Sequence, residues 1–164
     1  MGSNSKFPKI AAVIVVAFIL QIILITADHH ESPGKAAVEF SKAYFKLNNA
    51  MEKRLCSEIT EDGQSDVVDD YLYRMADQAK SEGFDSSWMK MVLLYIETET
   101  QMLEDNVAEV HLNCNRRRAV NPVFAIVAKI FSLGETYKVE ETLTLIKEDD
   151  LWKVCGEPFA LIEG

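Results

Sequence analysis

The sequence predicts an α+β fold: an N-terminal transmembrane helix followed by two amphipathic helices packed on an antiparallel sheet of about four strands. Three observations lead to this prediction. Residues 10–27 are almost entirely apolar and carry no charge. Apolar residues then recur at helical spacing in two segments, and further along they alternate with polar residues in runs separated by turns. Helices that precede such strands along the chain are typical of an α+β domain.

Residues 10–27, IAAVIVVAFILQIILITA, predict a membrane anchor. Eighteen helical residues at about 1.5 Å each span roughly 27 Å, which is near the lower limit for crossing a bilayer. Two lysines precede this run and Asp28 follows it. The positive-inside rule therefore places residues 1–9 in the cytoplasm, as a short tip, and the rest of the chain outside.

The alternative to an anchor is a cleaved signal peptide, because residues 25–27 form a tolerable cleavage sequence. The apolar run is longer than the usual h-region of about 7 to 15 residues, which favours the anchor. We therefore expect a single-pass protein of the cytoplasmic (inner) membrane, with its C-terminal domain in the periplasm or outside the cell. Residues 28–34, DHHESPG, form a short linker that keeps the domain close to the membrane surface.

The chain beyond the anchor is acidic. Residues 28–164 carry 15 basic and 26 acidic side chains, which gives a formal charge of −11. This charge argues against nucleic acid as a partner and against a general attraction to anionic lipid.

Three cysteines, Cys56, Cys114 and Cys155, are the candidates for a disulfide. One disulfide is plausible outside the cytoplasm, and the sequence does not choose the pair. The chain has no CxxC motif, no CxxCH motif for haem attachment and no zinc-ligand spacing. We therefore expect no metal and no cofactor.

The first amphipathic helix is predicted for residues 35–59, with Ser32 as its N-cap and Pro33 at its first position. Apolar residues at helical spacing predict its buried face. They are Ala36, Phe40, Ala43, Tyr44, Leu47, Met51 and Leu55.

The second amphipathic helix is predicted for residues 66–84, with Asp66 as its N-cap and Gly83 as its stop signal. Its apolar side is formed by Val67, Val68, Tyr71, Leu72, Met75 and Ala79.

Four runs predict the strands of an antiparallel meander. They are residues 88–103, 107–120, 135–147 and 151–156, with turns at 104–106 and 148–150. Within the runs, apolar and polar residues alternate, as in Ala108, Val110, Leu112 and Cys114 against Glu109, His111, Asn113 and Asn115. This alternation predicts a sheet with one face on the core and the other in water.

The opening helix, KAAVEFSKAYFKLNNAMEKRLCSEI, and the closing hairpin, TLTLIKEDDLWKVCG, carry a family resemblance. With the long strands between them they resemble the nuclear-transport-factor-2-like (cystatin-like, cone-shaped) extracytoplasmic domains that follow a single N-terminal membrane anchor. The resemblance implies a domain over residues 35–158 and a tail at 159–164, with a curved sheet wrapped around a helix and a pocket or groove in the cone. Single-anchor versions look like the periplasmic scaffold subunit of type IV secretion machines and like accessory proteins of lipid importers.

The stretch RRRAVNPVFAIVAKIF, residues 116–131, does not fit the strand pattern. Its apolar part is too short for a second membrane span, it does not alternate, and Pro122 lacks the N–H that a central strand needs. Two alternatives remain: a short helix that folds back over the mouth of the cone, or an exposed tip that contacts lipid phosphates or an acidic partner. The predicted contact residues are Arg116, Arg117, Arg118, Phe124, Ile126, Val127, Ile130 and Phe131, together with Gln21 on the anchor.

Two polar clusters are weaker candidates for a metal site. His29 and His30 could bind a metal ion or a neighbouring haem, but adjacent side chains on an extended linker point apart, which favours a solvated linker. The acidic residues between 58 and 70 lack the alternating pattern of a calcium loop, which favours a solvated face.

Two further pairs are candidates for a pocket. His111 and Glu109 could form an acid–base pair, but the strand alternation turns both toward solvent. Trp152 and Tyr137 could line a ligand pocket, but both also suit the role of core anchors for the closing hairpin.

Together these features predict a non-catalytic accessory or scaffold subunit of a larger membrane-associated complex. The anchor would confine the domain beside its partner, an integral membrane protein complex, and so raise its effective concentration there. The alternative is an extracytoplasmic binding module that holds a small apolar ligand or lipid in the cone pocket. We do not expect an enzyme, because the residues offer no recognisable nucleophile, oxyanion donors or paired carboxylates.

Overall fold

A computed structural model of the chain describes residues 13–21, 31–61, 67–118, 136–159 and 161. The chain divides into two compact units, Met1–Glu31 and Ser32–Gly164.

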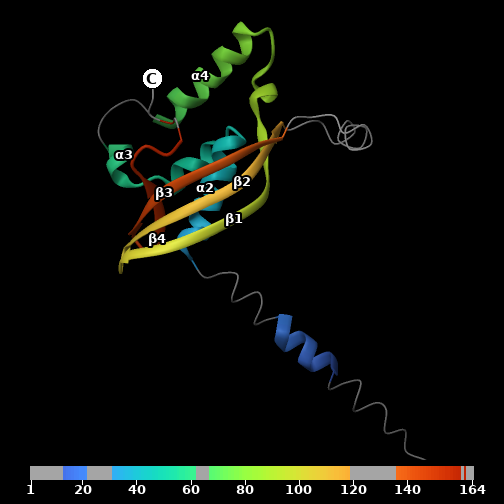
Figure 1. Ribbon diagram of the computed structural model, residues 1–164, viewed down its shortest axis with the longest axis vertical. Coiled ribbons are helices and arrows are strands. Elements are labelled where there is room, and N and C mark those ends of the chain that lie inside the picture. The colour runs from blue at the N-terminus through green and yellow to red at the C-terminus, as the bar shows by residue number, and fades with distance from the viewer. Residues whose placement is uncertain (1–12, 22–30, 62–66, 119–135, 160, 162–164) are drawn as a thin grey trace, which may run out of the picture. The chain divides into compact units, whose positions relative to one another are not determined.

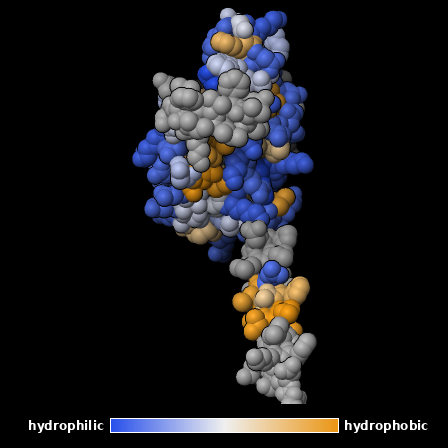
Figure 2. Space-filling model, turned by 90° about the vertical axis from the view of Figure 1, so that its right-hand side faces the viewer, coloured by the Kyte–Doolittle hydropathy of each residue, from blue (hydrophilic) through white to orange (hydrophobic). Residues whose placement is uncertain are grey.

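In the N-terminal unit, residues 13–21 are helical and their side chains are exposed. Seven of the first eight are large and apolar, and Figure 2 shows this stretch as a hydrophobic surface. Residues 10–12 and 22–27 of the predicted anchor lie outside the described residues. Within the described parts of the chain, no helix is both long enough and apolar enough to cross a membrane.

The second unit begins with α2, Pro33–Phe45. Ser32 is its N-cap, because the Ser32 hydroxyl accepts a hydrogen bond from the Lys35 N–H at 3.2 Å, and Pro33 occupies the first turn. The predicted cap is therefore confirmed. Because the helix starts at Pro33, it takes in the last two residues of the predicted linker.

The single helix predicted for residues 35–59 is wrong, because the chain there forms three short helices. After α2 come the 3-10 helix η1, Asn49–Arg54, and the helix α3, Ser57–Glu61. The break lies at Leu47, which has a φ of 52°. The Asn48 N–H donates to the Ala43 carbonyl and the Leu47 N–H donates to the Tyr44 carbonyl, both at 3.0 Å, so α2 ends in a Schellman motif without glycine.

The next helices are α4, Val67–Ser81, and the 3-10 helix η2, Ser86–Met89. Gly83, with a φ of 81°, stops α4 as predicted, because the Phe84 N–H donates to the Ala79 carbonyl across it at 2.8 Å. The predicted N-cap, Asp66, lies outside the described residues. The first strand was expected from residue 88, but residues 88–89 belong to η2.

Four strands form one antiparallel sheet in the order β1-β2-β3-β4. They are β1 Met91–Glu104, β2 Val107–Arg118, β3 Thr136–Glu148 and β4 Leu151–Cys155. The α+β class and the four-stranded meander are therefore confirmed. Residues 119–120 and 135, the outer ends of two predicted strands, lie outside the described residues.

The core lies between α2 and the inner face of the sheet, across which α2 runs (Figure 1). The approach to β1 is close at Gly34, where a Cβ would lie 3.2 Å from the Thr98 hydroxyl oxygen and 3.3 Å from that of Thr100. The largest fully buried side chains include Phe40, Met51, Leu55, Leu112, Leu143, Leu145 and Val154. The alternation predicted for β2 holds, since Ala108, Val110, Leu112 and Cys114 are all buried.

The end of the domain packs into this core. The Phe159 ring stacks on Tyr44 at 4.7 Å between centroids, and the Leu161 side chain is 1% exposed. The Leu161 carbonyl accepts a hydrogen bond from Arg74 Nη2 at 2.7 Å. Phe159 and Leu161, which fall in the predicted tail, are therefore part of the hydrophobic core cluster.

Candidate functional site

The arginines predicted to contact a partner end β2, where they pair with both neighbouring strands. Arg116 lies opposite Leu93 on β1 and Tyr137 on β3, whereas Arg117 lies opposite Val92 and Thr136. Residues opposite each other share a face of the sheet, and successive residues alternate between faces. Because Leu93 is buried, Arg116 points to the inner face and Arg117 to the outer one.

Arg116 is held by aromatic rings of its own domain. Its guanidinium carbon lies 5.8 Å from the ring centroid of Phe45, at the end of α2, and 5.7 Å from that of Tyr137. Its Nε is buried without a hydrogen-bond partner in the described part of the structure. The sequence did not predict these intramolecular contacts.

Arg118 lies over a second aromatic pair. Its guanidinium carbon is 4.1 Å from the ring centroid of Trp88, and the Trp88 ring stacks on Phe84 at 4.7 Å. Both rings are exposed. The short helix η2 that presents Trp88 is capped by Asp85, whose carboxylate accepts a hydrogen bond from the Ser87 N–H at 2.9 Å. This hydrogen bond lowers the pKa of Asp85.

More apolar side chains are exposed where β1 begins. Val92 and Leu94 are partly exposed, and Tyr95 is 83% exposed. The pairing of β1 with β2 shifts register between Leu94 and Glu97, and Tyr95 there has a φ of 52°. This irregularity turns the tyrosine ring outward. We call Phe84, Trp88, Val92, Leu94 and Tyr95 the β1-start cluster.

Sequence reasoning missed the β1-start cluster. Phe84 and Trp88 were placed at the end of a helix and the start of a strand, so they were not considered together. The available signal was the spacing of the two aromatic residues around Asp85-Ser86-Ser87, a turn sequence in which Asp85 can cap a short helix.

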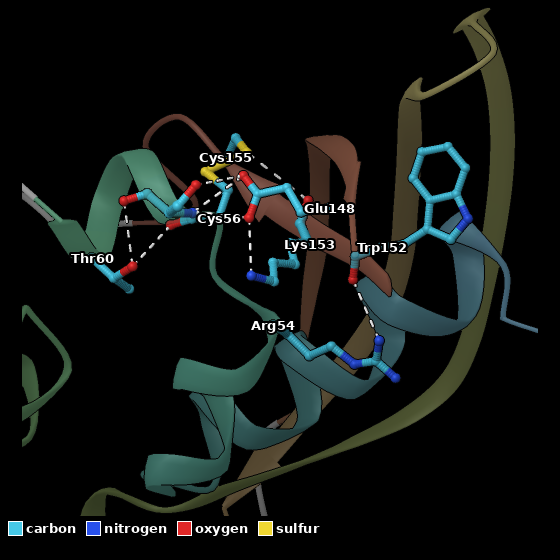
Figure 3. Close-up of polar contacts among 8 residues, drawn as sticks. Arg54, Cys56, Thr60, Glu148, Trp152, Lys153 and Cys155 are labelled. Carbon is cyan, nitrogen blue, oxygen red and sulfur yellow. Dashed lines mark hydrogen bonds and ion pairs between the residues drawn. A yellow bond between two sulfur atoms is a disulfide. The ribbon is translucent and has the colours of Figure 1, made fainter. Parts of the chain in front are cut away.

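The disulfide lies toward the other end of β3, where Cys155 pairs with Thr144, whereas Cys114 pairs with Val139 near the start of that strand. Cys56, immediately before α3, forms a disulfide with Cys155, at the end of β4, and their Cα atoms are 5.3 Å apart (Figure 3). Cys114 is a buried thiol, and burial raises its pKa. The disulfide lies beside a parallel bridge between Leu55 and Val154, so it ties the helical layer to the last strand.

Polar contacts surround this disulfide (Figure 3). The Glu148 carboxylate accepts hydrogen bonds from Lys153 Nζ at 2.9 Å and from the Ser57 hydroxyl at 2.8 Å. These contacts, the one from Lys153 foremost, hold the pKa of Glu148 below its ordinary value. Glu148 thus joins the β3–β4 hairpin to α3.

The other candidate residues are scattered. His111 is exposed on the outer face of the sheet, where its Nδ1 lies 3.1 Å from the Thr142 hydroxyl oxygen. Trp152 is buried in the core, whereas Tyr137 is 47% exposed and is therefore not a core anchor. Gln21 is exposed on the helical part of the N-terminal unit.

Five predicted contact residues fall outside the described residues: Phe124, Ile126, Val127, Ile130 and Phe131. The candidate metal ligands His29 and His30 also lie outside them. Among the residues that are described, no group of three or more His, Cys, Asp or Glu side chains is arranged to hold a metal ion.

No protein-family model matches this chain, and no curated protein matches it. Among solved structures, an NTF-2-like protein from Shewanella oneidensis MR-1 is similar to it, with a TM-score of 0.42 and 15% sequence identity. The similarity covers 73% of this chain and 88% of that one. A TM-score of 0.42 does not establish a shared family, so the resemblance to the nuclear-transport-factor-2-like family stays a prediction.

Proposed function

We propose that this protein is a non-catalytic accessory or scaffold subunit that is held at the membrane by its N-terminal segment and docks on a larger membrane complex. The docking surface is the β1-start cluster together with Arg117 and Arg118. The observation that carries the proposal is the exposure of these five apolar or aromatic side chains where β1 begins, with Trp88 against Arg118 and Val92 opposite Arg117.

The composition of this surface suits a protein partner. Aromatic residues and arginine are enriched at protein interfaces, and Trp, Tyr and Arg supply most residues that dominate binding. Larger exposed apolar patches mark interaction sites. The other contact residues predicted from the sequence, which follow Arg118 in the chain, lie outside the described residues.

Two features support the location outside the cytoplasm. The exposed helical residues 13–21, which are apolar up to Leu20, are the described part of the predicted anchor. The disulfide between Cys56 and Cys155 is of the kind that persists in oxidising compartments.

Site-specific photo-crosslinking in intact membranes tests the docking surface. A photoreactive amino acid is placed at Trp88 or Tyr95 and, as a matched control, at Tyr73, a 73% exposed aromatic residue on α4. We expect adducts with an integral membrane protein from positions 88 and 95 and none from 73. Equal adducts from all three positions, or none, would contradict the proposal.

The second candidate function is the binding of an apolar ligand in the cone. The interior between α2 and the C-terminal segment is packed, since Phe159 lies 6.2 Å from Phe40 and 5.1 Å from Phe45 between ring centroids. A ligand there would have to displace Phe159. Mass spectrometry of solvent extracts from the purified full-length protein tests this function, and a ligand present in near-equal molar amount would favour it.

A further inference from the structure

A groove lies between α2 and η1, apart from the β1-start cluster and outside the cone interior. Its volume is about 460 Å³, and Leu151 from the β3–β4 hairpin closes one side. Pockets that hold small molecules typically measure about 300–1,000 Å³. The lining residues are Glu39, Lys42, Ala43, Ala50, Lys53, Arg54 and Leu151.

The groove combines an apolar floor with charged rims. Ala43, Ala50 and the partly exposed Leu151 present only hydrocarbon. On one rim, Arg54 Nε donates to the Glu39 carboxylate at 3.0 Å. Arg54 Nη1 donates to the Trp152 carbonyl at 3.4 Å, a contact that Figure 3 shows. Arg54 therefore binds Glu39 and Trp152 of the same chain and forms part of the groove wall.

The two lysines of the groove are different. Lys42 lies on α2 and Lys53 on η1, and both side chains are exposed. Within the described part of the chain, neither ammonium group forms an ion pair. Two ammonium groups beside an apolar floor favour a ligand that has an anionic head and a hydrocarbon body.

The charge distribution of the domain supports the same kind of ligand. Residues 33–55, which supply most of the groove, carry five basic and two acidic side chains. Residues 56–164 carry 10 basic and 22 acidic side chains. The groove is therefore a positively charged area in an acidic domain, and it attracts an anion that most of the surface repels.

We propose that this groove binds a single-chain anionic amphiphile with a carboxylate head, such as a fatty acid. The carboxylate is held between Lys42 and Lys53, and the chain lies over Ala43, Ala50 and Leu151. This site does not depend on the docking surface at the β1-start cluster. A loss of ligand binding and a loss of partner binding are therefore separate results.

Photolabelling of the full-length protein in a nonionic detergent tests this site. The probe is dodecanoate that carries a diazirine at its chain end, and labelled peptides are mapped by mass spectrometry. We expect label on the peptides that contain residues 43–50 and Leu151. A dodecanol probe of the same length, which lacks the charge, should label these peptides about tenfold less, as expected for the loss of a charge-assisted contact.

Substitutions separate the groove from general partitioning into detergent. The double variant Lys42→Gln, Lys53→Gln should lose about tenfold in labelling, because it removes both cations without opening the core. Lys46→Gln is the matched control. Lys46 is exposed at the C-cap of α2, four residues after Lys42, but does not line the groove. Thermal unfolding confirms that each variant is folded. Equal labelling by the neutral probe, or equal labelling of the double variant and the wild type, would overturn the proposal.

Discussion

At the scale of single residues, Glu148 shows how one side chain can hold two layers together. Its carboxylate binds Lys153 on β4 and Ser57 on α3, so it bridges the hairpin and the helical layer. The sequence placed Glu148 in a turn and did not predict either contact. The contact with Lys153 is local to the hairpin, whereas the contact with Ser57 joins residues 91 positions apart and forms beside the disulfide between Cys56 and Cys155.

Glu148 should make the stability of the domain depend on pH. Its pKa is lowered from 4.5 in the folded state, so its contribution to stability is complete above pH 4.5. That contribution is lost as the pH falls through the lower pKa of the folded protein, because the unfolded chain then binds more protons. We expect Glu148→Gln to be less stable than the wild type in urea at pH 7, and the difference to shrink near pH 3.

The matched control for this titration is Glu97→Gln, which alters an exposed glutamate on β1. Glu97→Gln should change the free energy of unfolding between pH 7 and pH 3 by the same amount as in the wild type. If the difference in free energy of unfolding between Glu148→Gln and the wild type stayed constant with pH, the carboxylate would act only by its shape and not by its charge.

At the scale of elements, the sequence predicted helix starts and stops well where local chemistry decides them. Ser32 caps α2 and Gly83 ends α4, and both effects depend on a few neighbouring residues. The break at Leu47 was missed because leucine is a good helix former and rarely adopts a positive φ. Burial of Met51 and Leu55 after the break overrides that local preference.

The turn of the β3–β4 hairpin can be made more stable by substitution. Asp149 and Asp150 have φ values of 50° and 63°, which fit a two-residue type I′ turn. Asn-Gly is the favoured pair at these positions because both tolerate positive φ. We expect Asp149→Asn with Asp150→Gly to stabilise the domain by about 0.5–1 kcal/mol, as measured by urea unfolding.

The exposed ion pair between Lys147 and Asp150 is lost in this variant, and such pairs contribute little. The single variant Asp150→Ala, which loses the ion pair and keeps the strained φ, is the control. If the double variant were the less stable of the two, the turn assignment would be contradicted.

At the scale of the whole molecule, the sequence predicted the class of fold but only part of the interaction site. Alternation in β2 and β3 predicted the sheet because successive side chains of a strand point to opposite faces, so polar residues mark the solvent face and apolar residues the core face. The contacts of Arg116 and Arg118 with Phe45, Tyr137 and Trp88 join residues from α2, β3 and η2. No local pattern encodes such contacts, since they arise only when the sheet is assembled.

Substitutions in residues 116–131, the segment predicted to contact a partner, test whether the protein binds a membrane complex. Phe124→Asp with Ile126→Asp should lower the amount of membrane partner that co-purifies with the full-length protein by about tenfold, since buried charge is costly at an apolar interface. Circular dichroism should be unchanged. Tyr73→Asp, at an exposed site on α4, is the control and should retain the partner. Loss of folding in the double variant would place this segment in the core.

The spacing of the cysteines bears on the order of oxidation during synthesis. A chain delivered from its N-terminus presents Cys56 and Cys114 before Cys155 emerges, and the core still lacks Phe159 and Leu161 at that stage. Cys114 becomes shielded only when the core closes around β2. In the oxidising compartment that the proposed function requires, Cys56 and Cys114 would meet oxidant before Cys155, and a bond between them would have to convert to the native bond by thiol–disulfide exchange. On that proposal, the Cys114 thiol competes with Cys155 for Cys56, and we expect maturation to need a disulfide isomerase or slow oxidation.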